Sequence, residues 1–160
     1  MEMTTTPSIQ WQCLSFSALN VQQLYAILAL RSEVFVVEQN CVYQDPDGSD
    51  PACLHLIGWD QSAGNTYSIA AYLRIVPPGK KFDEASIGRV ITAPKFRACG
   101  AGTLLLQQGL TELQTSFPKQ AIRIRAQAYL ENFYGRFGFK PVSSIFVEDG
   151  IPHLEMLLRD

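Results

Sequence analysis

The order of the secondary-structure elements predicts an α+β (mixed α/β) fold built on one mixed, mostly antiparallel sheet. Hydrophobic periodicity indicates a strand, a helix, three strands, a helix, a strand, a helix and two closing strands. The three consecutive strands are separated by short turn-rich connectors, which is typical of an antiparallel meander. The strand–helix–strand unit at 85–128 instead predicts a right-handed parallel crossover. We therefore expect seven strands in one sheet, with helices packed on it.

In the first half of the chain, a strand at 9–16 precedes a helix that runs from about residue 21 to the mid-thirties. Asn20 can cap this helix, and Gln23, three residues later, completes a variant of the capping box. The segment 41–53 is rich in Pro, Gly and Asp and predicts a loop. Three strands are expected at 54–59, 66–76 and 85–92.

The second half begins with a helix at about 101–116, which ends at Phe117-Pro118. A strand at 121–128 follows, and then a short helix at 130–137, for which Gly138 provides a left-handed stop. Two closing strands, at 140–149 and 153–160, are joined by a turn at 150–152.

Length and composition exclude several classes of protein. A chain of 160 residues suits one domain, which we expect to span 1–160. The net charge of −2 argues against a non-specific nucleic-acid binder. No apolar run reaches the ~20 residues that a membrane helix needs, and residues 1–10 show no signal-peptide pattern. We expect a cytoplasmic protein with neither a nucleic-acid nor a membrane partner.

The cysteines predict free thiols rather than a metal site. They are Cys13, Cys41, Cys53 and Cys99. None belongs to a C-x-x-C pair, and the spacing of Cys41, Cys53 and His55 is looser than that of zinc ligands. The acidic run at 45–50 does not fit a calcium loop either, because Asp50 stands where such a loop needs glycine. We expect reduced thiols and no bound metal.

The stretch KFRACGAGTLLLQQGL (95–110) places two glycines at the start of a predicted helix. Glycine costs about 1 kcal/mol relative to alanine inside a helix, so Gly100 and Gly102 need another explanation. The N–H groups of a first helical turn are unpaired and carry partial positive charge, and glycine lets a phosphate approach them closely. Arg97 adds a cation beside them. The lysine of a Walker loop and the third glycine of a dinucleotide fingerprint, where Leu105 stands, are missing.

The motif that fits this stretch is R-x-x-G-x-G, residues 97–102. Three further segments accompany it in order: LRSEVFVVEQNCVYQDPDGSD (30–50), AQAYLENFYGRFGF (126–139) and EDGIPHLEM (148–156). With these segments the chain resembles the GNAT superfamily of acetyl-CoA-dependent N-acetyltransferases, and within it the ElaA-like branch of small bacterial proteins. The resemblance implies the GNAT acyl-CoA N-acyltransferase fold, with helices on both faces of the sheet and a splayed central strand pair. It also implies transfer of an acetyl group from acetyl-CoA to a primary amine by direct attack.

The resemblance further implies a binding mode for coenzyme A. Its pyrophosphate would lie on the amides of the glycine loop, and its pantetheine arm along the strand at 85–92. Gln127 stands where the superfamily often has an asparagine, and its side-chain amide can make the same hydrogen bonds. A strand N–H at Val90 or Ile91 would hold the oxyanion that forms during acyl transfer. The residues expected at the cofactor are Val90, Ile91, Thr92, Arg97, Ala98, Cys99, Gly100, Ala101, Gly102, Thr103, Gln127, Phe133 and Tyr134.

The same resemblance implies that Tyr134 protonates the leaving thiolate. Leu130, Phe133, Tyr134 and Phe137 also stand at i, i+3, i+4 and i+7, which is the spacing of a core stripe on a helix. A catalytic acid and a packed core tyrosine both remain open for Tyr134.

The base that takes a proton from the amine is not fixed by the resemblance. The candidates are Glu33, Glu38, His55, Glu148 and His153. We favour Glu38 and His153, because an acidic cluster suits a cationic amine and histidine exchanges a proton near neutral pH. Each candidate could also be purely structural, as a solvated helix end or a hydrogen-bonded strand histidine.

Two other functions stay open at this level: a non-catalytic acyl-CoA sensor with the same phosphate-binding loop, and an interaction domain in which the glycines serve packing. The sequence does not encode the acceptor. A small polyamine, an aminoglycoside-like molecule, a protein N-terminus and a lysine side chain are all compatible with it. It does not fix the oligomeric state either, and a homodimer is compatible with it.

Overall fold

The structure is a computed structural model and describes residues 8–64 and 66–159. The segment 1–7, which begins the stretch where no signal peptide is expected, lies outside the described residues. The strands are β1 (Ile9–Ser15), β2 (Leu54–Asp60), β3 (Ile69–Val76), β4 (Ser86–Thr92), β5 (Ile122–Gln127), β6 (Lys140–Pro141), β7 (Phe146–Glu148) and β8 (Ile151–Leu158). The helices are α1 (Val21–Arg31), α2 (Ala101–Ser116) and α3 (Glu131–Gly135), and a π-helical segment, η2 (Ser32–Glu38), extends α1.

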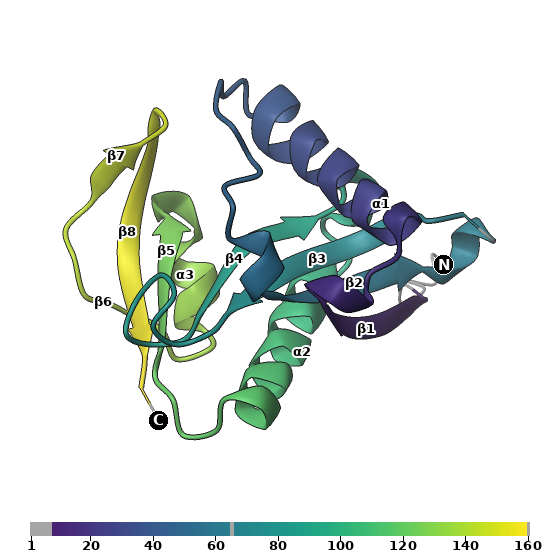
Figure 1. Cartoon of the computed structure of the whole chain (residues 1–160). Coiled ribbons are helices and arrows are strands. Elements are labelled where there is room, and N and C mark those ends of the chain that lie inside the picture. The colour runs from purple at the N-terminus through teal and green to yellow at the C-terminus, as the bar shows by residue number, and fades with distance from the viewer. Residues whose placement is uncertain (1–7, 65, 160) are drawn as a thin grey trace, which may run out of the picture.

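The strands form two four-stranded antiparallel sheets that lie side by side (Figure 1). The first sheet has the order β1-β2-β3-β4, and the second has the order β5-β8-β6, with β7 paired to β8. A parallel bridge between Ala85 and Ile122 joins the two sheets. The predicted meander and the predicted parallel contact between 85 and 128 are therefore confirmed.

The closing segment 140–149 is not one strand as predicted, so the described residues hold eight strands rather than seven, and these form two sheets rather than the one sheet predicted. Pro141 has no N–H group to donate to a ladder. Two residues later, Ser143 Oγ accepts the backbone N–H of Glu155 at 2.8 Å, in the place of a main-chain carbonyl. The ladder is broken there into β6 and β7, and both halves still pair with β8.

The first helix begins as predicted. Asn20 Oδ1 accepts the N–H of Gln23 at 2.7 Å, and Gln23 Oε1 accepts the N–H of Asn20 at 2.9 Å, which completes the capping box. Beyond Arg31 the helix widens into η2, where the Cys41 N–H donates to the Val36 carbonyl at 3.0 Å. Such π-helical turns are frequent at functional sites. This turn carries Glu38 to the end of the helix.

Helices cover both faces of the first sheet, as predicted (Figure 1). On one face, Ile27 of α1 packs with Tyr72 and Ile91. On the other, Leu105 of α2 packs with Leu73, the strand neighbour of Tyr72. Successive strand residues point to opposite faces, so the alternation of the sequence places one hydrophobic core on each side.

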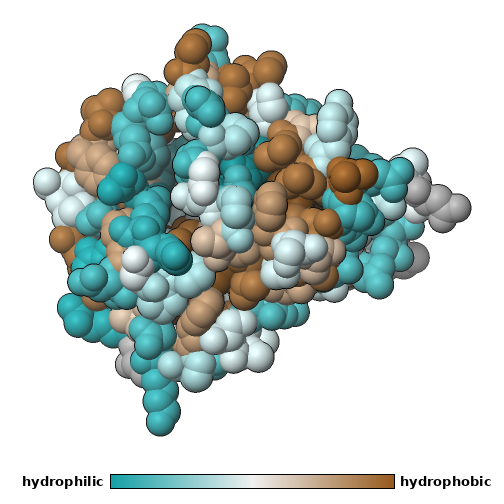
Figure 2. Space-filling model, in the orientation of Figure 1, coloured by the Kyte–Doolittle hydropathy of each residue, from teal (hydrophilic) through white to brown (hydrophobic). Residues whose placement is uncertain are grey.

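The surface is mixed in character. On the face in Figure 2, hydrophobic side chains gather over the region of α1, where Val21 is 82% and Tyr25 is 77% exposed. Among the described residues, no helix combines the length and the apolar character needed to cross a membrane.

Candidate active site: a cleft between two splayed strands

β4 and β5 separate as they leave the bridge at Ala85. The Arg123 N–H donates to the Ala85 carbonyl at 2.9 Å, and no further strand pairing joins β4 to β5 in the described part of the chain. The register between β3 and β4 shifts opposite Tyr72 and Arg74, and Arg89 there has a φ of 53°. This bulge bends β4 away from β5. The result is a cleft of about 470 Å³ between the two sheets, so the predicted splayed strand pair is confirmed.

The glycine loop closes one end of this cleft. Gly100 has a φ of 85° and Ala98 a φ of 63°, so the chain turns through left-handed conformations just before α2. A Cβ on Gly102 would lie 3.4 Å from Thr92 Oγ1 and 3.7 Å from Phe133 Cζ, which places Gly102 against the cleft wall. Gly100 thus supplies a backbone conformation and Gly102 supplies space.

The amide N–H groups of residues 98–103 are unpaired. None of them donates to a backbone or side-chain acceptor among the described residues. Helix first turns leave such donors free, and residues 98–100 add three more in an exposed loop. A Cβ on Gly100 would meet no atom within 4 Å, so no side chain covers this seat. The arrangement suits an oxyanion such as a phosphate.

Arg97 does not point freely into this seat. Its guanidinium Nη2 donates to Glu38 Oε2 at 2.9 Å, and its Nη1 donates to Glu38 Oε1. Its Nε donates to the Thr92 carbonyl at 3.3 Å. The hydrogen bonds from Arg97 hold the pKa of Glu38 below its usual value. A base needs affinity for a proton, so this environment disfavours Glu38 in that role.

Tyr134 is buried but borders the cleft. Its hydroxyl has no hydrogen-bond partner among the described residues. Of the fully buried side-chain polar atoms described, only Arg74 Nε lacks a partner, so the Tyr134 hydroxyl oxygen must reach the cleft surface. Burial raises the pKa of Tyr134, with a smaller contribution from Tyr129. The ring also packs edge-on against Phe133 and Phe139, so the residue has the features of both predicted roles.

His153, on β8, also lines the cleft and has a defined tautomer. Its Nδ1–H donates to the Ile151 carbonyl at 2.7 Å, which leaves the lone pair on Nε2. Glu148 Oε2 lies 3.9 Å from Nε2, while Glu148 Oε1 accepts from Arg125 at 2.8 Å. His153 pairs in register with Gln127, another predicted site residue, whose Nε2 lies 3.5 Å from Gln39 Oε1.

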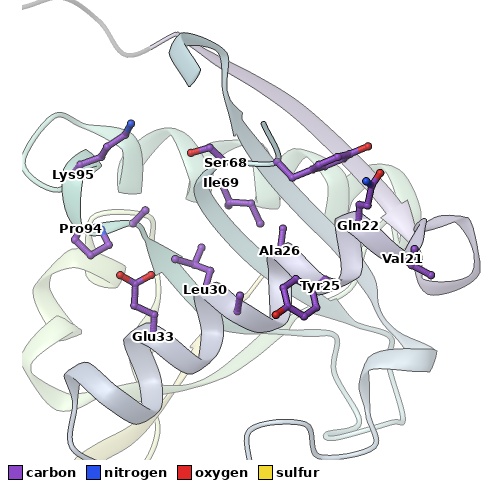
Figure 3. A pocket seen from close by; sticks show the side chains of 13 residues that line it. Val21, Gln22, Tyr25, Ala26, Leu30, Glu33, Ser68, Ile69, Pro94 and Lys95 are labelled. Carbon is purple, nitrogen blue, oxygen red and sulfur yellow. The ribbon is translucent and has the colours of Figure 1, made fainter. Parts of the chain in front are cut away.

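Two of the candidate bases lie outside the cleft. His55 is fully buried; its Nε2–H donates to the Asp50 carbonyl at 3.0 Å, and its Nδ1 accepts from the Tyr72 hydroxyl at 2.7 Å. Burial lowers the pKa of His55. Glu33 lines a separate hollow of about 890 Å³ between α1 and the segment at Pro94 (Figure 3). That hollow is larger than the cleft but is mostly apolar, and the α1 N-terminus on its wall is closed by the capping box of Asn20 and Gln23.

The loop at 41–53, which the sequence defined only as a loop, is held by a buried ionic network. Arg31 Nε donates to Asp45 at 2.7 Å, and Arg31 Nη1 donates to Asp50 at 2.7 Å. Arg74 binds Asp50 at 3.0 Å and Asp47 at 2.6 Å. The aspartates that raised the question of a calcium loop are thus occupied by arginines. The three closely spaced aspartates were visible in the sequence, but the arginines that bind them, Arg31 and Arg74, are distant in the chain and could not be identified from it.

The cleft also contains residues that sequence reasoning missed. Cys41 Sγ donates to the Asp149 carbonyl at 3.4 Å, so the loop after η2 touches the turn between β7 and β8 across the cleft. The sequence could have indicated that Arg125 does not face the core, because Ile122, Ile124 and Ala126 alternate with polar residues in β5. The missed residues that line the cleft include Gln39, Cys41, Tyr43, Lys81, Gly88, Arg89, Arg125, Tyr129 and Asp149.

Splayed strands beside a helix with free N-terminal amides are features of the GNAT acyl-CoA N-acyltransferase fold. A family model described as an acetyltransferase (GNAT) domain matches residues 62–159, and the chain belongs to this family. ElaA from Escherichia coli is 43% identical over 150 residues, which cover 92% of this chain and 95% of ElaA. The predicted resemblance to the ElaA-like branch is therefore confirmed.

Solved structures agree with this assignment. The crystal structure of Escherichia coli ElaA matches with a TM-score of 0.86 at 41% identity, covering 95% of this chain and 100% of that chain. A structure described as an acyl-CoA N-acyltransferase from Pseudomonas aeruginosa matches with a TM-score of 0.87 at 37% identity, covering 94% and 99% of the two chains. The predicted GNAT fold is confirmed, and this fold implies that an acyl-CoA binds the protein.

Proposed function

We propose that this protein is an acetyl-CoA-dependent N-acetyltransferase that transfers an acetyl group to a primary amine by direct attack. The observation that carries the proposal is the row of unpaired amides at residues 98–103, at the end of a cleft between splayed strands. These amides fit the pyrophosphate of coenzyme A, because they are unpaired and lie at the positive end of the α2 dipole, and residues 98–100 are exposed. Gly102 leaves room for the group to approach.

The edge of β4 that faces β5 would hold the arm of the cosubstrate. Its backbone groups at Val90, Ile91 and Thr92 have no partner strand on that side. Acetyl-CoA supplies the acetyl group as a thioester. An N–H at Val90 or Ile91 would donate to the carbonyl oxygen, where negative charge develops during transfer. Gln127 and Phe133 would contact the arm from the β5 and α3 side.

His153 would take the proton from the acceptor amine. Its Nδ1–H is engaged with the Ile151 carbonyl, so Nε2 is the nitrogen with a free lone pair. Tyr134 would give a proton to the departing sulfur, and its raised pKa keeps the hydroxyl protonated at neutral pH. Glu38 is a weaker candidate for the base because Arg97 lowers its pKa.

The test is a thiol-release assay with acetyl-CoA and a panel of amines and peptides. Release of coenzyme A that depends on the amine, with mass spectrometry of the acetylated amine, supports the proposal. Thermal unfolding with coenzyme A provides a separate measure of binding, because ligand at 100 times its dissociation constant stabilises the folded protein by about 2.7 kcal/mol. Stabilisation without release from any amine indicates an acyl-CoA sensor. If coenzyme A neither stabilises the protein nor is released in the assay, the glycines serve only packing.

A further inference from the structure

We propose that the acceptor is an amine that also carries a carboxylate, and that Lys81 binds this carboxylate in the cleft. The inference rests on the proposed N-acetyltransferase function and names the class of its acceptor. It depends on which charges in the cleft are already compensated and which are not.

Most charges on the cleft wall are paired within the protein. Arg125 Nη1 lies 2.8 Å from Glu148 Oε1 and its Nη2 lies 3.7 Å from Glu155 Oε1. Arg89 Nε lies 2.7 Å from Asp45 Oδ1. Glu38 is paired with Arg97 at the far end. These side chains have little free charge to offer to a ligand.

Lys81 differs from them. It lines the cleft, and among the described residues no carboxylate lies within ion-pair distance of its ammonium. Its nearest recorded partner is the ring of Phe82, 5.5 Å from Nζ to the centroid. Lys81 is an exposed residue at the cleft rim. Desolvation and the charges of Arg125 and Arg74 lower its pKa, and the charge of Glu148 opposes this shift. An uncompensated cation among other cations is stabilised when an anion binds beside it.

A second observation on the same face points in the same direction. Arg74 Nε is the only fully buried side-chain polar atom without a partner in the described residues. A Cβ placed on Gly88, which lines the cleft, would have Arg74 Nε as its nearest neighbour at 3.9 Å. This unpaired N–H therefore lies next to Gly88 at the cleft, although the charge of Arg74 is compensated by Asp47 and Asp50.

The turn between β7 and β8, which lines the same cleft, is suited to an amine. Asp149, on the turn between β7 and β8, also lines the cleft and has no cation within ion-pair distance among the residues described. His153 follows four residues later. A molecule with an ammonium toward Asp149 and a carboxylate toward Lys81 would compensate both charges. A polyamine would instead bring a second cation to Lys81, where like charges oppose it.

The experiment compares matched acceptors in the thiol-release assay at saturating acetyl-CoA. ω-Amino acids of increasing length are paired with alkylamines of matching chain, and α-amino acids are paired with their carboxamides. We expect kcat/KM to be at least tenfold higher for the best carboxylate-bearing amine than for its neutral partner. Lys81→Gln should reduce this preference below threefold by raising KM, and should leave the neutral amine within twofold. Lys81→Arg should retain the preference.

Lys80→Gln is the matched control, because Lys80 is exposed in the same loop and does not line the cleft; it should behave as the wild type. Equal or better turnover of the neutral partners overturns the inference. So does an equal loss for both members of a pair in Lys81→Gln, or acetylation of Lys81 itself found by mass spectrometry. If no amine releases thiol, the proposed function fails separately. The carboxylate-bearing amines and their neutral partners are then titrated by calorimetry into the complex with coenzyme A. Equal affinities for the two members of a pair overturn the inference.

Discussion

Glu38 and Arg97 form a bidentate ion pair at the glycine-loop end of the cleft, with Arg97 Nη2 2.9 Å from Glu38 Oε2. The pair joins the end of η2 to the loop that precedes α2, two segments 59 residues apart in the chain. Both side chains are more than 40% exposed, so water and salt can compete with the contact. Arg97 can therefore exchange the carboxylate for another anion at little cost.

The first prediction concerns this pair. Glu38→Gln should leave thiol release within about threefold of wild type, because an exposed ion pair contributes little and the lowered pKa makes Glu38 a weak base. Coenzyme A should bind as tightly as to wild type or more tightly, because Arg97 is released toward the phosphate seat. Calorimetric titration and a pH–rate profile measure the two effects. Loss of the acidic limb of that profile would instead identify Glu38 as the base.

The second prediction assigns the base to His153. Replacement by asparagine should lower kcat by about 10²–10⁴-fold, which is the usual contribution of a positioned base. The acidic limb of the pH–rate profile should disappear with it. Glu148→Gln is the comparison variant, because Glu148 touches His153 only at 3.9 Å and should leave the limb in place. A His153→Asn enzyme that keeps the wild-type profile would exclude this role.

The third prediction tests whether Tyr134 is an acid or a core residue. Tyr134→Phe keeps the packing against Phe133 and Phe139 and removes only the hydroxyl. Since the hydroxyl has no partner in the described residues, its loss should not reduce the melting temperature. Turnover should fall at least tenfold while coenzyme A binding is nearly kept. The control is Tyr129→Phe, at a 76% exposed tyrosine of the same cleft. Unchanged turnover in Tyr134→Phe would leave it a packing residue.

Local patterns predicted the elements that bury one face. The alternation of Ile122, Ile124 and Ala126 identified β5, and Asn20 with Gln23 identified the start of α1, because both signals depend on neighbours in the sequence. Residues 140–149 were predicted as one strand because their composition suits a strand. The break between β6 and β7 depends on Ser143 meeting the Glu155 N–H, a contact between separate segments.

The features of the site also divide into those that local sequence predicts and those that depend on contacts between distant segments. The glycine loop was visible in the sequence, because a helix rarely begins with two glycines unless backbone geometry or space requires them. The pairing of Arg97 with Glu38 and the isolation of Lys81 were not visible, because charge compensation is decided by which distant segments meet. His55 and His153 look alike in sequence, yet one is buried with both nitrogens bonded and the other borders the cleft.

The fourth prediction tests the space at Gly102. Gly102→Val places a branched side chain beside Thr92 and Phe133, where a Cβ alone would lie 3.4 Å from Thr92 Oγ1. We expect at least tenfold weaker coenzyme A binding by calorimetry. Gln107→Val introduces the same residue at an exposed position of the same helix, away from the glycine loop. Equal affinities of the two variants would show that the phosphate does not lie at this turn.

The fifth prediction concerns the buried network beneath the cleft. Asp50 accepts from Arg31 at 2.7 Å and from Arg74 at 3.0 Å, so Asp50→Asn leaves two buried guanidiniums undercompensated. Removing one partner of such a buried pair costs about 3–5 kcal/mol. Urea unfolding at pH 7 measures the loss. Asp83→Asn, at an exposed aspartate with no ion pair among the described residues, should change stability by less than about 0.5 kcal/mol.

The same carboxylates determine how stability depends on acid. Burial alone would raise the pKa of Asp50, but the hydrogen bonds and charges of Arg31 and Arg74 outweigh it and lower that pKa. The hydrogen bonds from Arg74 likewise lower the pKa of Asp47. An aspartate in the unfolded chain titrates near about 3.9. A folded pKa below that value means that the unfolded chain binds more protons, so the stabilisation is complete above about pH 5 and is lost as the pH falls.

Unfolding free energies measured from pH 7 down to pH 3 should therefore decline for the wild type below about pH 5. The decline should be shallower for Asp50→Asn, because asparagine has no proton to bind and one source of the slope is gone. Asp83→Asn should follow the wild-type slope. Parallel curves for Asp50→Asn and wild type would mean that Asp50 has the same pKa in the folded and unfolded chains, and would contradict the lowering of that pKa by Arg31 and Arg74.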